Sequence, residues 1–316
     1  MPRTSSPPGT TGRASTGAGP AERRGTALVL SSYVLWGLFP LYFRLLDAAG
    51  AVEILSHRIV LTAFTCLLLV TATRGWERVR AAVGQRRQLL ALTAAGVLVT
   101  LNWLIYVYGV ITGRTADAAL GYFINPLVTV ALAALVLGER LRRAQGVAIV
   151  LAVIAVAVAS QGRLPWISLA LAASFGLYGL VKHQVRVDAL TGLTLESCLV
   201  LPLGLGYLTY LAATGSLALQ GPQGSVTLGA LFLLSGPVTA VPLLLFAAGA
   251  RRVPLSTVGI VQFLGPVLQF LLAWLVLGEA ISPTRWAAMA VIAVASVVFC
   301  ADLVAQMRSL PRSRRT

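Results

Sequence analysis

The sequence predicts an all-α polytopic membrane protein with ten transmembrane helices, and three observations support this fold class. The chain is 57% hydrophobic and only 11% charged, with a mean hydropathy of +0.84, whereas a soluble domain carries about 25% charged residues. Apolar stretches of about 20 residues, long enough to cross the bilayer core, follow one another almost without interruption. The pentapeptide 135–139 recurs letter for letter at 275–279, which indicates an internal repeat.

Five apolar runs are expected to form helices in the first half of the chain: 26–46, 51–73, 89–112, 116–138 and 142–160. The first run is too long for the apolar core of a signal peptide, which spans about 7–15 residues, so we expect it to be retained. Turn formers such as Gly50 and Gly113 separate the runs. The fifth run and the last run of the chain, 283–304, are the least polar, and both are expected to form an outer scaffold or a homodimer surface.

Five further runs are expected to form the helices of the second half: 165–183, 190–213, 226–249, 254–277 and 283–304. The chain then divides into a first repeat over 26–160 and a second over 165–304. Residues 1–25 are rich in Pro, Ser, Thr and Gly and are expected to form a disordered cytoplasmic tail. Residues 305–316 are expected to form a basic cytoplasmic tail, and no soluble domain fits between the runs.

The two halves are expected to lie in opposite orientations in the membrane. Pro126 and Pro266 each stand twelve residues before the glycine of the repeated pentapeptide. The segment 36–39 resembles 175–178 at an offset of 139. Because five crossings per repeat is an odd number, the second copy starts on the opposite side of the membrane. This inverted arrangement is typical of secondary transporters.

The distribution of basic residues predicts that both termini are cytoplasmic. The net charge is +15 and all basic residues except Lys182 are arginine. Twenty of the 25 basic residues fall in the tails and in alternate connecting segments, which the positive-inside rule places in the cytoplasm. The arginines are clustered between apolar runs, so the charge indicates membrane orientation and contact with the lipid bilayer, not nucleic-acid binding.

The sequence indicates no cofactor, no metal site and no catalytic residues. Lys182 lacks the glycine-rich context of a phosphate-binding loop. Cys66, Cys198 and Cys300 lie inside apolar runs without disulfide or metal spacing. If the protein moves a molecule, it is therefore expected to do so passively or by coupling to an ion gradient.

Ionisable residues in the apolar runs form two candidate gating or proton-coupling groups, because a charge in the bilayer is costly and rarely idle. The outer group is Arg44, Glu53, His57 and Arg58. The inner group is Lys182, His183 and Glu196. The offset of 139 relates His57 to Glu196 and Arg44 to His183, which suggests opposing gates whose ion pairs alternate. The competing interpretation is that these side chains anchor helix ends at the membrane surface.

Amides and aromatic residues near the helix centres are the candidate substrate-binding residues. They are Trp36, Phe39, Asn102, Trp103, Tyr106, Tyr122, Asn125, Phe175, Tyr178, Gln262 and Gln269. The alternative role for each amide is an interhelical hydrogen bond, worth about 0.6 kcal/mol on average. Pro126 and Pro266 are expected to kink their helices and expose backbone beside the amides.

The repeated pentapeptide has a structural interpretation of its own. Gly138 and Gly278 are suited to terminate helices. Glu139 and Glu279 would then stand at the start of the next helix, where a negative charge is favourable.

Several segments together resemble the RarD family of EamA-type drug/metabolite transporters. They are Trp36–Arg44, Glu53–Arg58, Asn102–Tyr106, Ala119–Pro126, Ser174–Gly179 and Gln262–Pro266. One departure is Asp117, where the family usually has glutamate. The resemblance implies two inverted five-helix EamA repeats in a bacterial inner membrane. It also implies a permease for a small metabolite or drug, which is expected to export its substrate.

The expected mechanism is alternating access about a central site near Asn102, Asn125 and Gln262. A coupling proton could be carried by His57, Glu53 or Glu196. Two other functions stay open at this point: an intramembrane enzyme acting on a lipid or envelope intermediate, and a partner or sensor subunit that transports nothing.

Overall fold

The structure is a computed structural model that describes residues 19–138, 141–160 and 164–309, and these residues form helices without strands. The first half contains α1 (Pro20–Arg44), α2 (Ala51–Ala72), α3 (Trp76–Val83), α4 (Arg86–Ile111), α5 (Thr115–Leu137) and α6 (Arg143–Ser160). The second half contains α7 (Trp166–His183), α8 (Ala189–Ala213), the 3-10 helix η1 (Ala218–Gln220), α9 (Val226–Ala250), α10 (Leu255–Val261), α11 (Leu264–Leu275) and α12 (Pro283–Ser309).

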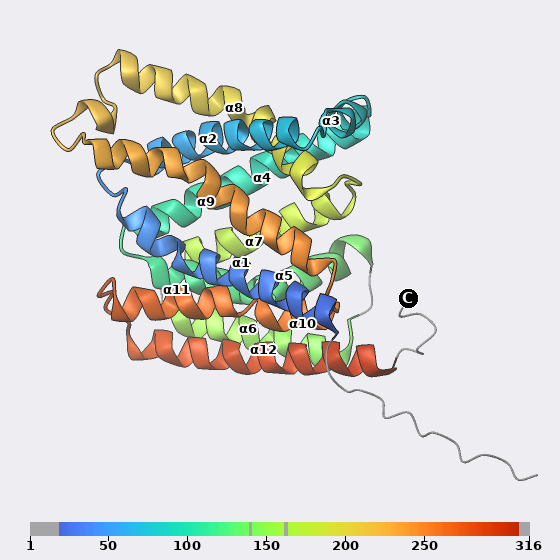
Figure 1. Cartoon of the computed structure of the whole chain (residues 1–316). Helices are drawn as coiled ribbons and strands as arrows, with labels where there is room; N and C mark the ends of the chain where they lie inside the picture. The colour runs from blue at the N-terminus through green and yellow to red at the C-terminus, as the bar shows by residue number, and fades with distance from the viewer. Residues whose placement is uncertain (1–18, 139–140, 161–163, 310–316) are drawn as a thin grey trace, which may run out of the picture.

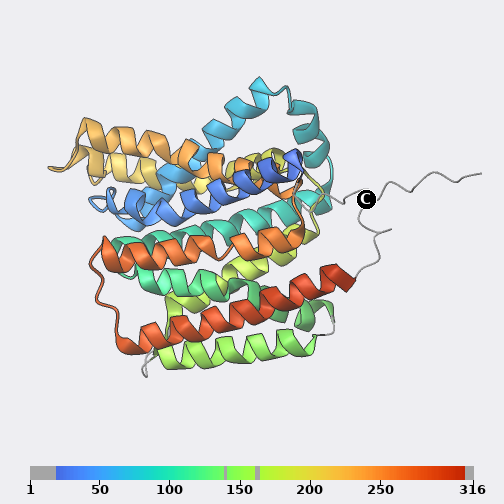
Figure 2. The same cartoon turned by 60° about the horizontal axis from the view of Figure 1, so that its bottom comes forward.

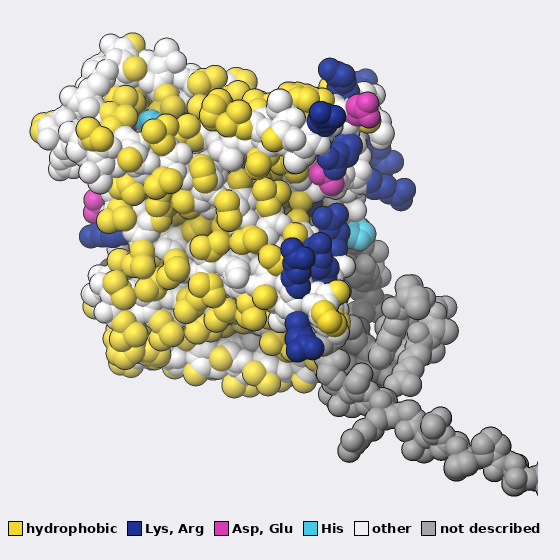
Figure 3. Space-filling view, viewed as in Figure 1, with side chains coloured by type: hydrophobic (Ala, Val, Ile, Leu, Met, Phe, Trp, Pro, Cys, Tyr) yellow, Lys and Arg dark blue, Asp and Glu magenta, His cyan; other side chains and the backbone are white. Residues whose placement is uncertain are grey.

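The all-α membrane fold is confirmed. Eight segments of the described chain are long and apolar enough to span a membrane, the pair α10–α11 counting as one. In hydrocarbon only hydrogen-bonded helices satisfy the backbone within one segment. The helix α6 is apolar but shorter, and α7 ends in Lys182 and His183. The predicted count of ten crossings therefore stays a prediction. The long helices run side by side, and apolar side chains cover the face between the two ends of the bundle (Figures 1 and 3).

Most helix boundaries lie close to the predicted ones, with four differences. The helix α1 begins at Pro20, so 20–25 is helical and not part of a tail, whereas 1–18 lies outside the described residues. The helix α12 continues to Ser309, past the predicted end at 304. The short elements α3 and η1 were not predicted. The single helix predicted for 254–277 was wrong, because α10 and α11 are separate.

The break between α10 and α11 has a backbone cause. It falls at Gln262 and Phe263, one turn before Pro266. A proline cannot donate to the carbonyl four residues earlier and its ring crowds that carbonyl. The equivalent Pro126 lies inside α5, which continues as one helix. A kink at Pro126 stays a prediction.

Local sequence also explains several helix ends. Asp188 and Ser225 accept backbone N–H groups at the starts of α8 and α9, as N-cap side chains commonly do. Gly138 ends α5 with φ of 69°, in the left-handed region that glycine adopts without strain. The predicted helix-terminating role of Gly138 is confirmed.

Basic side chains gather at one end of the bundle. In Figure 3 the Lys and Arg side chains concentrate at the right, where α1 begins, α3 lies and α12 ends in Figure 1. The two ends of the described chain thus lie on the same side. The cytoplasmic assignment of that side stays a prediction.

Helix contacts between the two halves occur in matching pairs: when each helix is replaced by its equivalent in the other half, one observed contact becomes another observed contact. We match α1 with α7, α2 with α8, α4 with α9, α5 with α10–α11, and α6 with α12. The helix α5 packs on α7, and α11 packs on α1. Likewise α4 packs on α7, and α9 packs on α1. The helices α6 and α12 pack on each other at one edge of the bundle, as both views show (Figures 1 and 2).

Individual contacts follow the same exchange. A Cβ atom built on Gly37 of α1 would lie 2.7 Å from the Cβ of Leu268 in α11. A Cβ atom built on Gly176 of α7 would lie 3.4 Å from Cγ1 of Val128 in α5. Gly176 is the counterpart of Gly37 at an offset of 139, and Leu268 is that of Val128 at 140. These close approaches support the predicted inverted repeat, which we carry forward as a proposal.

Candidate functional site

Arg58 of α2 is buried, and no carboxylate of the described residues lies within ion-pair distance of it. Arg58 is only 3% exposed. The Nε atom donates to the hydroxyl of Thr239 in α9 at 2.8 Å. The Nη1 atom is buried and has no hydrogen-bond partner among the described residues. A guanidinium in this position therefore keeps an unused hydrogen-bond donor.

Aromatic rings surround the guanidinium of Arg58. Its central carbon lies 4.1 Å from the ring centroid of Trp103, 5.4 Å from that of Phe43 and 5.6 Å from that of Phe39. Distances within about 6 Å allow cation–π attraction. Phe39 and Phe43 come from α1 and Trp103 from α4, so two helices besides α9, which supplies Thr239, define this position. We call these three rings with Arg58 the arginine cage.

Asn102 of α4 holds α4 against α7. Its Nδ2 donates to the carbonyl of Leu171 and to the hydroxyl of Ser174, both at 3.0 Å. Its Oδ1 accepts from the hydroxyl of Tyr122 at 2.9 Å. Asn102 is 1% exposed, so these bonds satisfy an amide inside a closed helix interface. Asn102 thus forms interhelical hydrogen bonds, which was the alternative to substrate binding that the sequence had left open.

The other three predicted amides do not converge with Asn102 through hydrogen bonds. Gln262 donates to the carbonyl of Gly259 within its own segment. Gln269 is buried and donates to the carbonyl of Trp36 at 3.0 Å, which joins α11 to α1. Asn125 is buried, and its Oδ1 has no hydrogen-bond partner among the described residues, as is also true of Oε1 of Gln269.

The predicted aromatic residues form two local clusters. Tyr106 and Tyr122 have ring centroids 5.4 Å apart, and Phe175 lies 6.3 Å from Tyr122. Phe175 is in turn 5.7 Å from Tyr178. In the second cluster, Trp36 of α1 packs with Phe246 of α9. Phe246 is the counterpart of Tyr106 at an offset of 140. The hydroxyl of Tyr106 is buried and has no hydrogen-bond partner in the described part of the chain.

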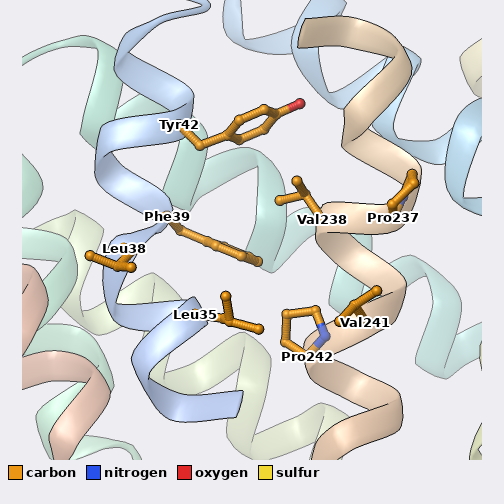
Figure 4. Close-up of a pocket in the computed structure, with 8 residues that line it drawn as sticks. All are labelled: Leu35, Leu38, Phe39, Tyr42, Pro237, Val238, Val241 and Pro242. Atoms are coloured by element: carbon orange, nitrogen blue, oxygen red, sulfur yellow. The ribbon is translucent and has the colours of Figure 1, made fainter. Parts of the chain in front are cut away.

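A cavity of about 320 Å³ lies between α1 and α9, away from the predicted amides. Its lining is Leu35, Leu38, Phe39, Tyr42, Pro237, Val238, Val241 and Pro242. Of the predicted substrate-binding residues only Phe39 is among them. Figure 4 shows the Phe39 ring reaching from α1 toward α9, with Leu35 and Pro242 beneath it. We call this cavity the α1–α9 cleft. Since Leu35, Leu38 and Val241 are at least 36% exposed, the cleft is open at the surface of the bundle.

The outer ionisable group does not form ion pairs among its own members. Arg44 is exposed and pairs with Asp47 at 3.6 Å. Glu53 is buried and accepts the backbone N–H of Ala218 at 2.9 Å, at the start of η1. His57 is half-buried and stacks on Phe232 with ring centroids 3.9 Å apart.

The inner ionisable group does form an ion pair. Nζ of Lys182 on α7 contacts Oε1 of Glu196 on α8, and Glu196 is 3% exposed. The hydroxyl of Tyr178 donates to the other oxygen of Glu196 at 3.4 Å. His183, which was predicted to belong to this group, is exposed at the end of α7.

The glutamate of the second pentapeptide takes an unexpected position. Glu279 accepts the backbone N–H groups of Thr115 and Ala116 at the start of α5. The prediction that it begins the next helix was wrong, because that helix is α12, which starts at Pro283. Glu139 lies outside the described residues.

Asp117 forms a second polar centre beside this contact. Its two oxygens meet Arg114 and Arg285, each at 2.9 Å, and its side chain is 4% exposed. Sequence reasoning missed this centre and Tyr42, Phe43 and Thr239 as well. For the Asp117 centre, the signal available in the sequence was the acidic residue of the family motif at this position. The others carry no pattern that distinguishes them from core residues.

Comparisons with known proteins agree with this architecture. The EamA-like transporter family matches residues 23–161. Protein RarD from Streptomyces exfoliatus is 41% identical over 93% of this chain and 92% of its own length. The chain belongs to the RarD family of EamA-type transporters.

Other RarD-family relatives cover the chain to a similar extent. Protein RarD from Escherichia coli (strain K12) is 38% identical over 90% of this chain and 97% of its own length. The chloramphenicol-sensitive protein RarD of Pseudomonas aeruginosa is 33% identical over 83% and 88%, respectively. A solved crystal structure with 17% identity superposes with a TM-score of 0.56, covering 87% of this chain and 96% of that one, which supports the fold alone.

Membership of the RarD family makes the chain a bacterial inner-membrane transporter of the drug/metabolite superfamily. The names of its relatives point to transport and away from an enzyme. The arginine cage, the Asn102 contacts and the α1–α9 cleft are therefore features of a membrane transporter.

Proposed function

We propose that this RarD-family protein is a secondary transporter that moves a small organic molecule across the inner membrane by alternating access. One observation carries the proposal: two helix interfaces that are equivalent under the proposed inverted repeat differ, since one is open and the other is closed. The α1–α9 interface contains the cleft, whereas its counterpart α4–α7 is closed by Asn102.

The correspondence holds residue by residue. Leu35 and Pro242, which line the cleft, are the counterparts of Ser174 and Asn102, which close α4–α7. In an inverted repeat the two halves can exchange conformations with little change in packing, since each half already adopts one of the two forms. Opening α4–α7 while closing α1–α9 would then expose the site to the other side of the membrane.

The polar groups support the same interpretation. The inner pair of Lys182 and Glu196 is formed, whereas Glu53 and His57 of the outer group take part in no ion pair among the described residues: Glu53 accepts from the backbone of Ala218, and His57 stacks on Phe232. This combination fits a state closed on the basic side and accessible from the opposite side. We further propose that the basic side is cytoplasmic, that transport runs outward, and that Glu53, His57 or Glu196 carries a coupling proton.

Cysteine reactivity tests the exchange of the two interfaces. In a background without Cys66, Cys198 and Cys300, Leu35→Cys should react with N-ethylmaleimide much faster than Ser174→Cys, because Ser174 is 4% exposed. Adding Asn102→Ala should raise the rate at Ser174→Cys and lower it at Leu35→Cys. Thr93→Ala on the same helix is the matched control and should change neither rate.

Solute flux tests transport itself. Proteoliposomes should accumulate a labelled solute from a panel that includes chloramphenicol and small carboxylates, measured at two pH values. Chloramphenicol is included because one relative carries its name. Parallel changes at both cysteine positions, together with no flux of any solute, would contradict alternating access.

A further inference from the structure

We propose that Arg58 binds the anionic group of the substrate, and that the substrate is an organic anion with an apolar body, such as an aromatic carboxylate. This inference rests on the transport function proposed above and adds to it the chemical class of the transported molecule.

The first argument is the missing counter-charge. Arg58 is 3% exposed, and the described residues place no carboxylate within ion-pair distance of it. A buried guanidinium is strongly disfavoured unless an anion and further hydrogen bonds compensate its lost hydration. The hydroxyl of Thr239 compensates only one N–H group. A bound anion would supply the remainder.

The second argument is that the buried acids in the described part of the chain are engaged elsewhere. Glu53 accepts from the backbone of Ala218, Glu196 pairs with Lys182, and Asp117 is shared between two arginines. The half-buried His57 one position away stacks on Phe232. None of these groups offers Arg58 a negative charge from α2 or from the helices packed on it.

The third argument is that hydrogen-bond donors in and beside the arginine cage have no partner among the described residues. Nη1 of Arg58 and the hydroxyl of Tyr106 are both buried without hydrogen-bond partners. Both side chains pack against the same ring: Phe43 lies 5.4 Å from the guanidinium carbon and 6.0 Å from the ring of Tyr106. A carboxylate is recognised by an arginine fork and a hydroxyl, since both can donate to its oxygens.

The surroundings define the rest of the ligand. Phe39, Phe43 and Trp103 offer ring faces around the charge, and these favour an apolar or aromatic body. Phe39 belongs both to the cage and to the wall of the α1–α9 cleft. Figure 4 shows this ring between the two helices, so the cleft ends against the residue that covers Arg58. The cleft is therefore a route to Arg58 for a molecule with an apolar body.

Binding to the purified full-length protein in detergent tests the inference. The probes are phenylacetate, phenylacetamide and phenethylamine, which share a shape and differ in charge, with chloride as the inorganic anion. Thermal shift and calorimetry should show that phenylacetate binds at least tenfold more tightly than the amide and the amine. This comparison uses the unaltered protein, so it does not depend on whether a variant folds.

Variants then assign the preference to Arg58. Arg58→Gln should remove the advantage of phenylacetate, Arg58→Lys should retain part of it, and Tyr106→Phe should weaken phenylacetate binding several-fold without affecting the amide. The control Arg87→Gln makes the same chemical change at an exposed position of α4 and should leave the preference intact.

The outcomes separate this inference from transport. Equal binding of the three aromatic probes, or binding of chloride without phenylacetate, would overturn the organic-anion assignment. Anion-selective binding that depends on Arg58 but is accompanied by no flux in proteoliposomes would support this site and count against the transport proposal. Flux of neutral solutes without any anion preference would support the transport proposal and count against the anion site at Arg58.

Discussion

Glu279 and Thr115, 164 positions apart, are joined by a hydrogen bond of 2.7 Å from the backbone N–H of Thr115 to Oε1 of Glu279. The second oxygen of Glu279 accepts from Ala116 at 2.9 Å. The N-terminus of a helix carries unsatisfied N–H groups and partial positive charge. A carboxylate from the second half of the chain thus caps a helix of the first half.

Replacing Glu279 should lower the stability of the protein. We expect Glu279→Ala to cost about 1–2 kcal/mol, in the range of lost helix caps, and Glu279→Gln to cost less because an amide oxygen can still accept one bond. The measurement is thermal unfolding in detergent. Glu77→Gln, an exposed acid in the first turn of α3, is the control. An equal change in both glutamine variants would refute the cap.

Asp117 should contribute more than an exposed acid, because it is buried between Arg114 and Arg285. Asp117→Asn keeps the shape and removes the charge, which should destabilise the protein by about 1–3 kcal/mol. The control is Asp47→Asn, whose pair with Arg44 is half exposed and should be worth about 0–1 kcal/mol. Thermal unfolding of both variants checks the difference, and the reverse order would refute it.

Gly236 should tolerate no side chain. A Cβ atom there would overlap the carbonyl group of Leu61 and the hydroxyl of Thr65 in α2. Gly236→Ala should therefore destabilise the α2–α9 interface by roughly 1–3 kcal/mol. Gly229→Ala on the same helix is the matched control, since its Cβ would meet only Leu219 at 3.8 Å. That substitution should be neutral or stabilising, because alanine favours helix. Equal unfolding temperatures for the two variants would contradict this account.

Asp188 predicts one component of the pH dependence. Burial acts to raise the pKa of Asp188, but hydrogen bonds from Thr191 and the charge of Arg78 outweigh it and hold the pKa below its ordinary value of 3.8. The stability that Asp188 provides is therefore fully present above pH 3.8 and declines as the pH falls through the lowered pKa.

Comparing the unaltered protein with Asp188→Asn at pH 7 and at pH 3 tests this sign. The difference in unfolding temperature should be largest at pH 7 and should shrink at pH 3. Asp47→Asn serves as the control acid on the opposite end of the bundle. A difference that grows on acidification would refute the assignment.

The amino-acid sequence by itself determined the membrane class and most helix limits. A bilayer requires every backbone polar group to be bonded within the segment, so an apolar run of sufficient length has essentially one available structure. The repeated pentapeptide likewise provided the offset of 140 that relates Val128 to Leu268, and the segments 36–39 and 175–178 provided the offset of 139 that relates Gly37 to Gly176. Pro266 favours the break at Gln262, but the equivalent Pro126 lies inside a continuous α5, so the sequence alone did not determine that break.

Only the tertiary structure decided which polar groups meet. Arg58 and Glu53 share a helix, yet one lies among rings from α1 and α4 and the other bonds to η1. Glu279 caps α5 and not α12. These partners lie far apart along the chain, and helical periodicity says which face a residue occupies but not which helix covers that face. The packing of helices alone sets that choice, and with it the position of the cleft beside Phe39 and the unpaired charge of Arg58.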